Sequence, residues 1–215
     1  MVNEDNSTLI KLIETLADNK LVLGDQLVEI GISGPNLEAT LAAVSIAQSE
    51  LGHARLLYNW VHELKSGGKR EKRPDIQNQT GKAFATAIGS TDWLTLIASL
   101  YATNVATDIV LHAIASSSKL EKLPSFEKLL REQDEHIMYA RNWCEQLTND
   151  RGRIPVKFQS DLATSLEETA DWLNGVQTSD LFERLGVSDQ LTDLVTLFEQ
   201  ANESVVKTKE LAYGS

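Results

Sequence analysis

The sequence predicts an all-α fold, with a four-helix bundle as its core and two or so extra helices toward the C-terminus. Long segments have apolar residues at helical spacing, and no segment alternates apolar and polar residues as a strand would. Helix interiors exclude proline, and the four prolines all fall between the helical segments: Pro35, Pro74, Pro124 and Pro155. The chain has 215 residues, 42% of them hydrophobic, which is enough for one substantial core. We therefore expect a single domain over residues 1–215, with the bundle at about 7–148 and the C-terminal helices at about 155–211.

The first two predicted helices form a hairpin. The first spans residues 7–31, with leucines at helical spacing, and ends at a Gly-Ile-Ser-Gly-Pro turn. The second spans residues 36–65 and ends at a pair of glycines. The polar, basic segment that follows, residues 67–82, has no periodicity and is predicted to be an exposed loop. Because the turn between the two helices is short, we expect them to pack antiparallel.

The next two predicted helices form a second hairpin. The third opens at Asp92, which has good N-cap chemistry, and runs to about residue 117. The fourth follows Pro124, with Ser125 as its N-cap, and runs to about residue 147. These two helices complete the predicted four-helix core.

The remaining helices are predicted beyond this core. A fifth helix follows Pro155, and Gly175 and Gly186 bracket a short helical piece. A last helix begins at Ser188. Together these segments give the two or so extra helices of the predicted fold.

Composition excludes several classes of function. The net charge of −11 repels phosphate backbones, so nucleic acid is not expected as a partner. The single cysteine, Cys144, permits no intrachain disulfide, which fits a reducing compartment. The N-terminal residues do not resemble a signal peptide, and no run of about 18 apolar residues predicts a membrane span. We expect a soluble, cytoplasmic protein.

Glu50 and His53 are the most informative pair in the chain. They stand at i and i+3 within a long helix, so both side chains point to the same neighbour. A Glu-x-x-His pair that meets a histidine from another helix, here His136, is how four-helix bundles build metal centres. The candidate metal ligands are therefore Glu50, His53 and His136, with Asp108 or Glu132 as additional ligands.

Counting along the two hairpins places polar residues from all four helices at one level of the bundle. The first helix contributes Lys20 and the third contributes Asn104, while the residue three before His136 is Gln133 rather than glutamate. Two interpretations follow. The polar groups form a buried hydrogen-bond network, with Lys20 bonded to Glu50 and His53 to Asn104 or Gln133, or they hold a metal ion. From the motif alone, the network is favoured over the metal.

Two further groups are interpreted as structural. His112 is expected to be a satisfied core imidazole rather than a ligand. The basic residues Lys69, Arg70, Lys72 and Arg73 are expected to form a solvated loop. The alternative for this loop is a grip on an acidic partner or on a nucleotide-bearing cofactor such as coenzyme A.

These residues resemble a known family, the A- and C-type subunits of ring-1,2-phenylacetyl-CoA epoxidase, which are ferritin-like proteins of phenylacetate breakdown. The segment GPNLEATLAAVSIAQSELGHARLLY, residues 34–58, looks like the second bundle helix of this family. Residues 16–29 resemble the first helix of the C-type subunit, and residues 91–143 resemble the third and fourth helices in order. The resemblance covers about residues 10–148 and implies a ferritin-like bundle.

The resemblance also implies a role for each polar position. In the A-type subunit, carboxylates and Glu-x-x-His pairs hold a di-iron centre, whereas the C-type subunit has lost the metal and supports the A-type. Here Glu50, His53 and His136 match the ligand pattern. Three positions where the pattern has a carboxylate have lost their negative charge, and they correspond to Lys20, Asn104 and Gln133.

The resemblance is therefore closer to the non-catalytic C-type subunit. It implies no cofactor, and a protein partner that is either an A-type subunit or a second copy of the chain. The alternative is a metal-dependent oxidoreductase with iron in a mononuclear or degenerate site. A coenzyme A thioester is a further candidate ligand, whereas neither nucleic acid nor a membrane is expected.

Overall fold

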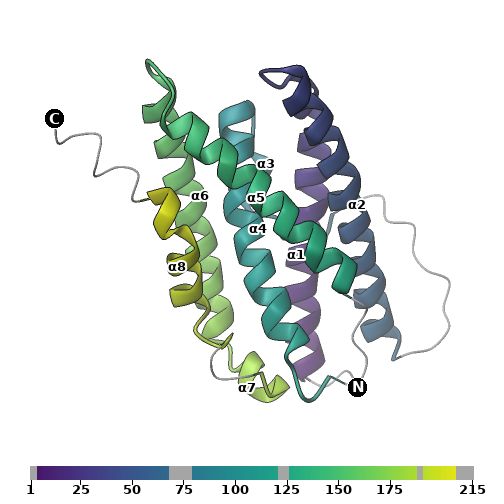
Figure 1. Ribbon diagram of the computed structural model, residues 1–215. Coiled ribbons are helices and arrows are strands. Elements are labelled where there is room, and N and C mark those ends of the chain that lie inside the picture. The colour runs from purple at the N-terminus through teal and green to yellow at the C-terminus, as the bar shows by residue number, and fades with distance from the viewer. Residues whose placement is uncertain (1–3, 68–78, 121–125, 188–190, 207–215) are drawn as a thin grey trace.

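The all-α prediction is confirmed. The computed structural model describes residues 4–67, 79–120, 126–187 and 191–206, and no strand occurs in these ranges. The helices, coloured along the chain in Figure 1, are α1 (Glu4–Glu29), the 3-10 turn η1 (Gly31–Ser33), α2 (Leu37–Ser66), α3 (Ala85–Ile88), α4 (Trp93–Ala115), α5 (Glu127–Thr148), α6 (Ile154–Gln177), α7 (Leu181–Leu185) and α8 (Leu194–Val206).

The helices pack around α4. The hairpin of α1 and α2 lies on one side of it, α6 and α8 lie on the other, and α5 crosses the front of the bundle (Figure 1). Every residue of α4 from Leu96 to Thr107 is buried, as expected for a helix that is apolar all round. By length and composition α4 could cross a membrane, but 78% of its most apolar window is buried inside the bundle. Core packing therefore accounts for its hydrophobicity.

Local capping fixes the helix boundaries of the core. The Asn36 side chain accepts the backbone N–H of Ala39 at 2.7 Å at the start of α2. Asp92 and Thr95 form a capping box at the start of α4. At the end of α2, Gly67 adopts the left-handed conformation, with φ of 61°, that glycine favours. These boundaries lie within one or two residues of the predicted ones.

The C-terminal helices differ from the prediction in two details. Helix α6 includes Pro155 in its first turn, where no intrahelical N–H is needed, and it continues past Gly175. The last helix, α8, begins at Leu194 rather than at Ser188, which lies outside the described residues. Asp193 sets this start, because its carboxylate accepts the backbone N–H of Thr196 at 3.2 Å as an N-cap does.

The predicted N-cap of the fourth helix, Ser125, also lies outside the described residues, and so do four basic residues of the predicted loop: Lys69, Arg70, Lys72 and Arg73. Within the described part, α5 follows directly on Phe126. The imidazole of His112 is exposed rather than in the core, because it pairs with Asp108 one turn earlier on α4. Its Nδ1 lies 3.2 Å from the Asp108 carboxylate.

A buried carboxylate on α1 holds the segment that leads into α3. Asp18 is fully buried and accepts the backbone N–H groups of Lys82 at 2.6 Å and of Thr80 at 2.8 Å. It also accepts the hydroxyls of Thr80, at 2.9 Å, and of Tyr58. Burial, together with the bond to Asp18, raises the pKa of the Tyr58 phenol. We refer to Asp18, Tyr58, Thr80 and Lys82 as the Asp18 anchor.

The short helix α3 was not predicted, because its capping groups lie far away in the sequence. Asn19 Oδ1 accepts the backbone N–H of Phe84 at 2.9 Å. The Glu168 carboxylate on α6 accepts the first two N–H groups of α3, those of Ala85 at 2.6 Å and Thr86 at 2.9 Å. A carboxylate at a helix N-terminus satisfies its free donors and complements its dipole.

The Asp18 anchor predicts a specific loss of stability. We expect Asp18→Ala to lower the free energy of unfolding by about 3 kcal/mol, because it leaves two backbone N–H groups and a buried phenol without their acceptor. Urea denaturation measures this change. Asp25→Ala is the matched control, since Asp25 is an exposed aspartate on the same helix. A loss for Asp18→Ala no larger than that of the control would contradict the anchor.

Candidate functional site

The candidate site is a polar cluster at the centre of the bundle. It contains four fully buried residues, one from each of α1, α2, α4 and α5, and two nearly buried histidines. We call it the Lys20 cluster, and its members are Lys20, Glu50, His53, Asn104, Gln133 and His136.

These polar residues occupy positions that the helical period assigns to the core. On α1, Lys20 lies four residues after Leu16 and three before Leu23, and both leucines are almost fully buried. On α5, Gln133 and His136 continue the buried face that begins at Leu129. Because the helix period points these side chains inward, they must find partners in each other.

The Lys20 ammonium is the centre of the cluster. Its Nζ lies 3.1 and 3.0 Å from the two carboxylate oxygens of Glu50 and 2.6 Å from Asn104 Oδ1, and it also donates to Gln133 Oε1. The three acceptor residues come from three other helices. An ammonium has three N–H donors, so this arrangement uses each one. The geometry therefore requires the protonated, charged form of Lys20.

The other groups are oriented around this charge. Gln133 Nε2 donates to the backbone oxygen of Asn104 at 2.7 Å and to its Oδ1 at 2.9 Å, while Asn104 Nδ2 donates to Glu50 Oε1 at 3.2 Å. His136 Nδ1 lies 2.7 Å from the same Glu50 oxygen and, facing an acceptor, bears the proton. Both amides thus direct their oxygens to the ammonium.

Lys20 and Glu50 form a buried ion pair. Burial alone would raise the pKa of the Glu50 carboxyl, but the Lys20 charge and the His136 hydrogen bond outweigh it and lower that pKa to about 2. Burial lowers the pKa of Lys20, and the Glu50 charge opposes this shift. One positive and one negative charge therefore compensate each other in the core.

His53 links the Lys20 cluster to the surface. Its Nε2 lies 2.9 Å from the Glu132 carboxylate, which is 21% exposed, whereas its Nδ1 is buried and has no hydrogen-bond partner among the described residues. Burial and the nearby Lys20 charge lower the pKa of His53 to about 4, so the imidazole is neutral at pH 7. The ring of His53 lies 5.6 Å from that of His136, centre to centre.

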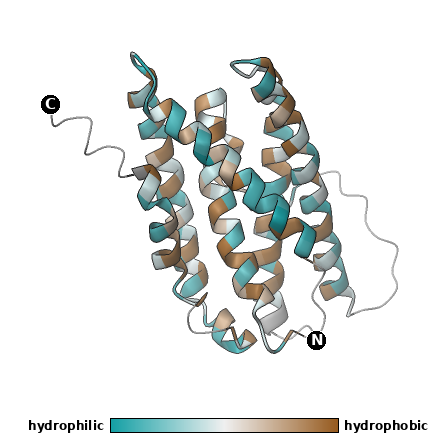
Figure 2. Ribbon diagram, viewed as in Figure 1, coloured by the Kyte–Doolittle hydropathy of each residue, from teal (hydrophilic) through white to brown (hydrophobic). Residues whose placement is uncertain are grey.

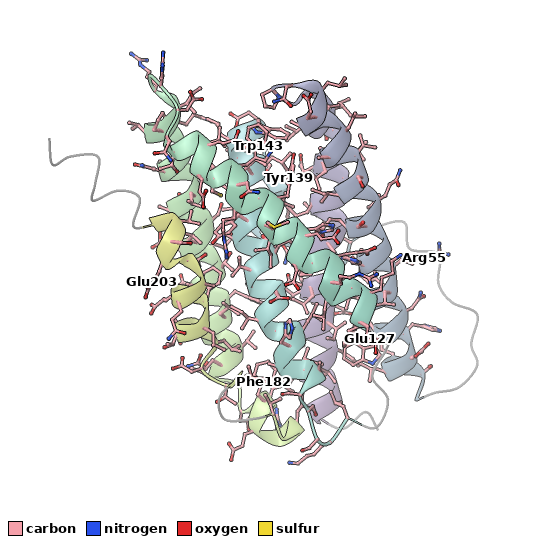
Figure 3. The ribbon with its side chains drawn as sticks, in the orientation of Figure 1. Arg55, Glu127, Tyr139, Trp143, Phe182 and Glu203 are labelled. Carbon is pink, nitrogen blue, oxygen red and sulfur yellow. The ribbon has the colours of Figure 1, made fainter. Side chains whose placement is uncertain are left out.

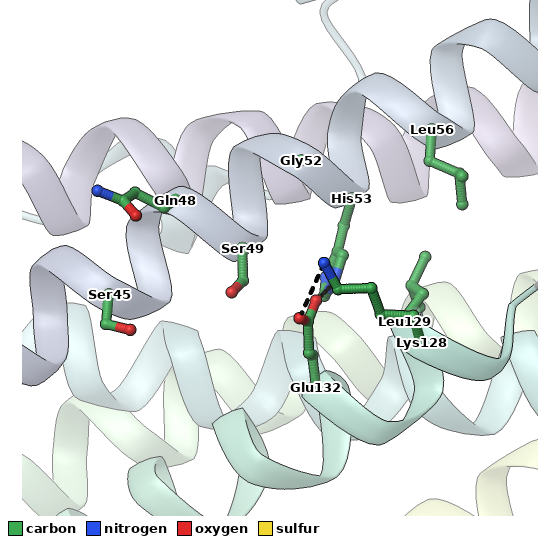
Figure 4. A pocket seen from close by; sticks show the side chains of 9 residues that line it. All are labelled: Ser45, Gln48, Ser49, Gly52, His53, Leu56, Lys128, Leu129 and Glu132. Carbon is green, nitrogen blue, oxygen red and sulfur yellow. Dashed lines mark hydrogen bonds and ion pairs between the residues drawn. The ribbon is translucent and has the colours of Figure 1, made fainter.

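An open hollow lies outside His53, between α2 and α5 (Figure 4). It has a volume of about 430 Å³. We call it the α2–α5 hollow, and it is lined by Ser45, Gln48, Ser49, Gly52, His53, Leu56, Lys128, Leu129 and Glu132. Three of the six lining residues from α2 are small, namely Ser45, Ser49 and Gly52, so α2 and α5 are not closely packed over this stretch. The His53–Glu132 pair closes the hollow on the side of the Lys20 cluster.

The structure brings most of the predicted site residues together. Glu50, His53 and His136 each offer one potential ligand atom within 4.8 Å of the other two. The predicted contact of Lys20 with Glu50 is present. Whether the three candidate ligands hold a metal stays a prediction.

Other predicted contacts differ. His53 bonds Glu132 rather than Asn104 or Gln133, because those two amides are already bonded to Lys20 and to each other. Asp108, considered as a further ligand, pairs instead with His112. Glu132 lies beside His53, where it orients the imidazole from the outside.

Sequence reasoning missed the Asp18 anchor, although Asp18 is only two residues from Lys20. In the structure Asp18 is fully buried and next to another buried polar residue, Asn19. Apart from Tyr58, their partners come from residues 80–84, at a sequence separation of about 60 residues. Helical periodicity contains no information on such contacts.

The Lys20–Glu50 pair predicts strong coupling in a double-mutant cycle. We expect Lys20→Met to lower the free energy of unfolding by about 4 kcal/mol, because Glu50 then remains as a buried, uncompensated charge. The double variant Lys20→Met/Glu50→Gln should recover most of this loss. Urea denaturation of the two single variants and the double variant measures the coupling. Additive losses would show that the two groups do not interact.

The pKa values also predict how stability depends on pH. The pKa of His53 is about 4 in the fold against an ordinary value of 6.5, so the unfolded chain binds more protons between these values. The contribution of His53 to stability should therefore be complete above pH 6.5 and fall as the pH is lowered toward 4. Glu50, with its pKa lowered from 4.5 to about 2, adds a second loss below pH 4.5.

His53→Gln separates these two effects. The variant should abolish the loss between pH 6.5 and 4 and keep the loss below it. Urea midpoints across this range provide the measurement. An unchanged slope in the variant would exclude His53 as the group responsible.

Comparisons with known proteins show the family of the chain. Among curated proteins, none matches this chain. The sequence model of the family described as phenylacetic acid catabolic protein matches residues 1–213. This match covers all four helices that contribute to the Lys20 cluster, together with α6, α7 and α8. The chain therefore belongs to the phenylacetic acid catabolic protein family.

Proposed function

We propose that this chain is a non-catalytic, partner-binding subunit of a phenylacetyl-CoA epoxidase-type oxygenase, and that it acts in phenylacetate breakdown. One observation supports this most directly: the Lys20 ammonium has acceptors from three other helices at the position where the family resemblance expects a carboxylate ligand. A fixed positive charge at that position opposes metal binding.

The residues of the Lys20 cluster do not fit a pair of iron ions. A dinuclear site in a bundle uses several carboxylates, which offset the charge of two dications. Glu50 is the only carboxylate in the cluster, and Lys20 already neutralises it. Asn104 and Gln133 stand where the resemblance expects anions and are neutral amides. No step of oxygen activation is therefore assigned to this chain.

The rest of the bundle supports a role through association. The amides of Asn104 and Gln133 are close in size to carboxylates, so the core keeps its packing while it loses the charge of a metal site. A complete bundle without a metal can still present its helix faces to an A-type oxygenase subunit. The proposed role therefore needs the fold and its surface but no chemistry at the centre.

A second candidate is a mononuclear metal site. Two histidines and one carboxylate form a facial set of ligands for iron, and Glu50, His53 and His136 are close enough to offer it. The specific observation that favours this interpretation is the buried Nδ1 of His53, which has no hydrogen-bond partner among the described residues. Against it, Lys20 contacts both carboxylate oxygens of Glu50 and would have to move.

Metal content tests the two candidates. We expect protein purified from iron-supplied cells to contain no stoichiometric iron, manganese or zinc by elemental analysis. Two iron ions per chain would overturn the proposal. One metal ion per chain that is lost in His53→Ala would establish the mononuclear alternative, while metal retained in that variant would exclude this ligand set.

A gain-of-function variant makes the same test sharper. The triple variant Lys20→Glu/Asn104→Glu/Gln133→Glu restores three carboxylates. It should allow a divalent metal ion to bind, because it removes the ammonium and places anions at the centre of the bundle. Lys20→Met is the matched control, since it removes the positive charge without adding a ligand. Metal uptake by the control alone would mean that Lys20, rather than the missing carboxylates, decides the outcome.

A further inference from the structure

A second hollow lies between α1 and the junction of α6 with α7. It has a volume of about 280 Å³. We call it the α1–α6 groove, and it is lined by Lys11, Leu12, Trp172, Gly175, Val176 and Leu181 together with three hydroxyl side chains. No residue of the Lys20 cluster is among the described residues that line it, so the groove is separate from the candidate site.

The groove continues a cleft that the chain itself fills nearby. Asn19 on α1 and Glu168 on α6 both accept backbone N–H groups at the start of α3, so this segment bridges the two helices. The Phe84 ring packs against Trp172 in a T-shaped arrangement, with 5.3 Å between the ring centres. Beyond Trp172, the described part of the chain leaves the space between α1 and α6 open. The groove therefore lacks the apolar filling that Phe84 supplies beside it.

The walls of the groove are apolar. Leu12 and Leu181 are buried, and Trp172 and Val176 are half-buried. Gly175 leaves open space in front of α6, because a Cβ atom there would meet nothing within 4 Å. Ligand pockets in proteins are mostly apolar and have volumes from about 300 Å³ upward. The groove lies at the lower end of this range, which suits the apolar part of one small molecule.

The polar groups of the groove define which ligand it suits. The hydroxyl of Thr15 donates to the backbone oxygen of Lys11 at 3.1 Å, and that of Ser179 donates to the backbone oxygen of Val176 at 2.6 Å. Both hydroxyl protons are thus already used within their own segments. Lys11 is exposed and is the only charged residue among the described residues that line the groove. An apolar groove with one ammonium at its edge is complementary to an amphipathic anion.

The groove differs from an ordinary solvent-facing helix surface. The outer face of α5, for comparison, is largely hydrophilic (Figure 2) and bears the exposed side chains of Arg131, Asp134 and Glu135. The groove, in contrast, is bounded by more than one helix. Helix α7 lies across the lower end of the bundle, where Phe182 is buried (Figure 3). Its neighbour in the chain, Leu181, lines the groove at this end.

We propose that the α1–α6 groove binds a small aliphatic carboxylic acid, with its hydrocarbon chain against Leu12, Trp172 and Val176 and its carboxylate at the Lys11 ammonium. Burial of the hydrocarbon chain supplies affinity, and the charged contact sets its direction. An aliphatic chain is flexible enough to follow a groove between two helices, and most of the apolar walls are aliphatic. The inference goes beyond the proposed function and does not depend on it, because the Lys20 cluster takes no part in this contact.

Isothermal titration calorimetry of the full chain with octanoate tests the proposal. We expect saturable binding of one octanoate per chain. Gly175→Leu should raise the dissociation constant at least about tenfold, because the new side chain fills the groove. The variant should fold normally, since the site is open and leucine favours helix over glycine. Binding that does not saturate, or that is unchanged in Gly175→Leu, would overturn the proposal.

Gly52→Leu is the matched control, because Gly52 is a helical glycine with equally open space in the α2–α5 hollow. This variant should bind octanoate as the wild-type chain does. Loss of binding in Gly52→Leu would place the ligand in the α2–α5 hollow and would contradict the assignment.

Lys11→Met tests the charged contact. It removes the ammonium but keeps a side chain of similar length, so octanoate should bind at least about fivefold more weakly. The neutral alcohol 1-octanol, which forms no ion pair, should bind the wild-type chain and the variant equally. An unchanged affinity for octanoate, or an equal loss for both compounds, would exclude Lys11 as the partner of the carboxylate.

Discussion

The Lys20 ammonium ties the bundle together, because its three hydrogen bonds end on α2, α4 and α5 while its own helix is α1. A lysine in this position can be satisfied only when all four helices are at their correct height. A one-residue shift of α1 would turn its side chain about 100° away from the acceptors. The interaction therefore gives the bundle its register, even though the net stability of a buried ion pair is small.

The surrounding contacts hold Lys20 in place. On the same helix, Asp18 and Asn19 bind the segment that leads into α3, and Glu168 of α6 receives the first N–H groups of that short helix. The N-terminal hairpin is thus joined to the C-terminal helices by polar contacts as well as by apolar packing.

Much of this architecture can be predicted from local sequence patterns. The long helices follow from apolar periodicity and from caps such as Asn36 and Asp92, and the level of Lys20, Glu50 and Gln133 follows from counting along two hairpins. The pairing of His112 with Asp108 is a local contact one helical turn apart, and the sequence contains it. The partner of His53 and the existence of α3 could not be predicted, because both depend on packing between segments that are distant in the sequence.

The residues that distinguish the Lys20 cluster from a metal site depend on one another, because their charges must balance in the buried core. With Lys20 charged and Glu50 as the only carboxylate, the centre is neutral, and the amides of Asn104 and Gln133 complete its hydrogen bonds without adding charge. A carboxylate at either amide position would leave an excess negative charge in a fully buried site, which costs several kcal/mol unless a cation enters with it. A glutamate in place of Lys20 alone would put two buried carboxylates together. The cluster is therefore stable with its present residues, or with carboxylates at most of the ligand positions and a bound cation. Variants with a composition between these two are less stable.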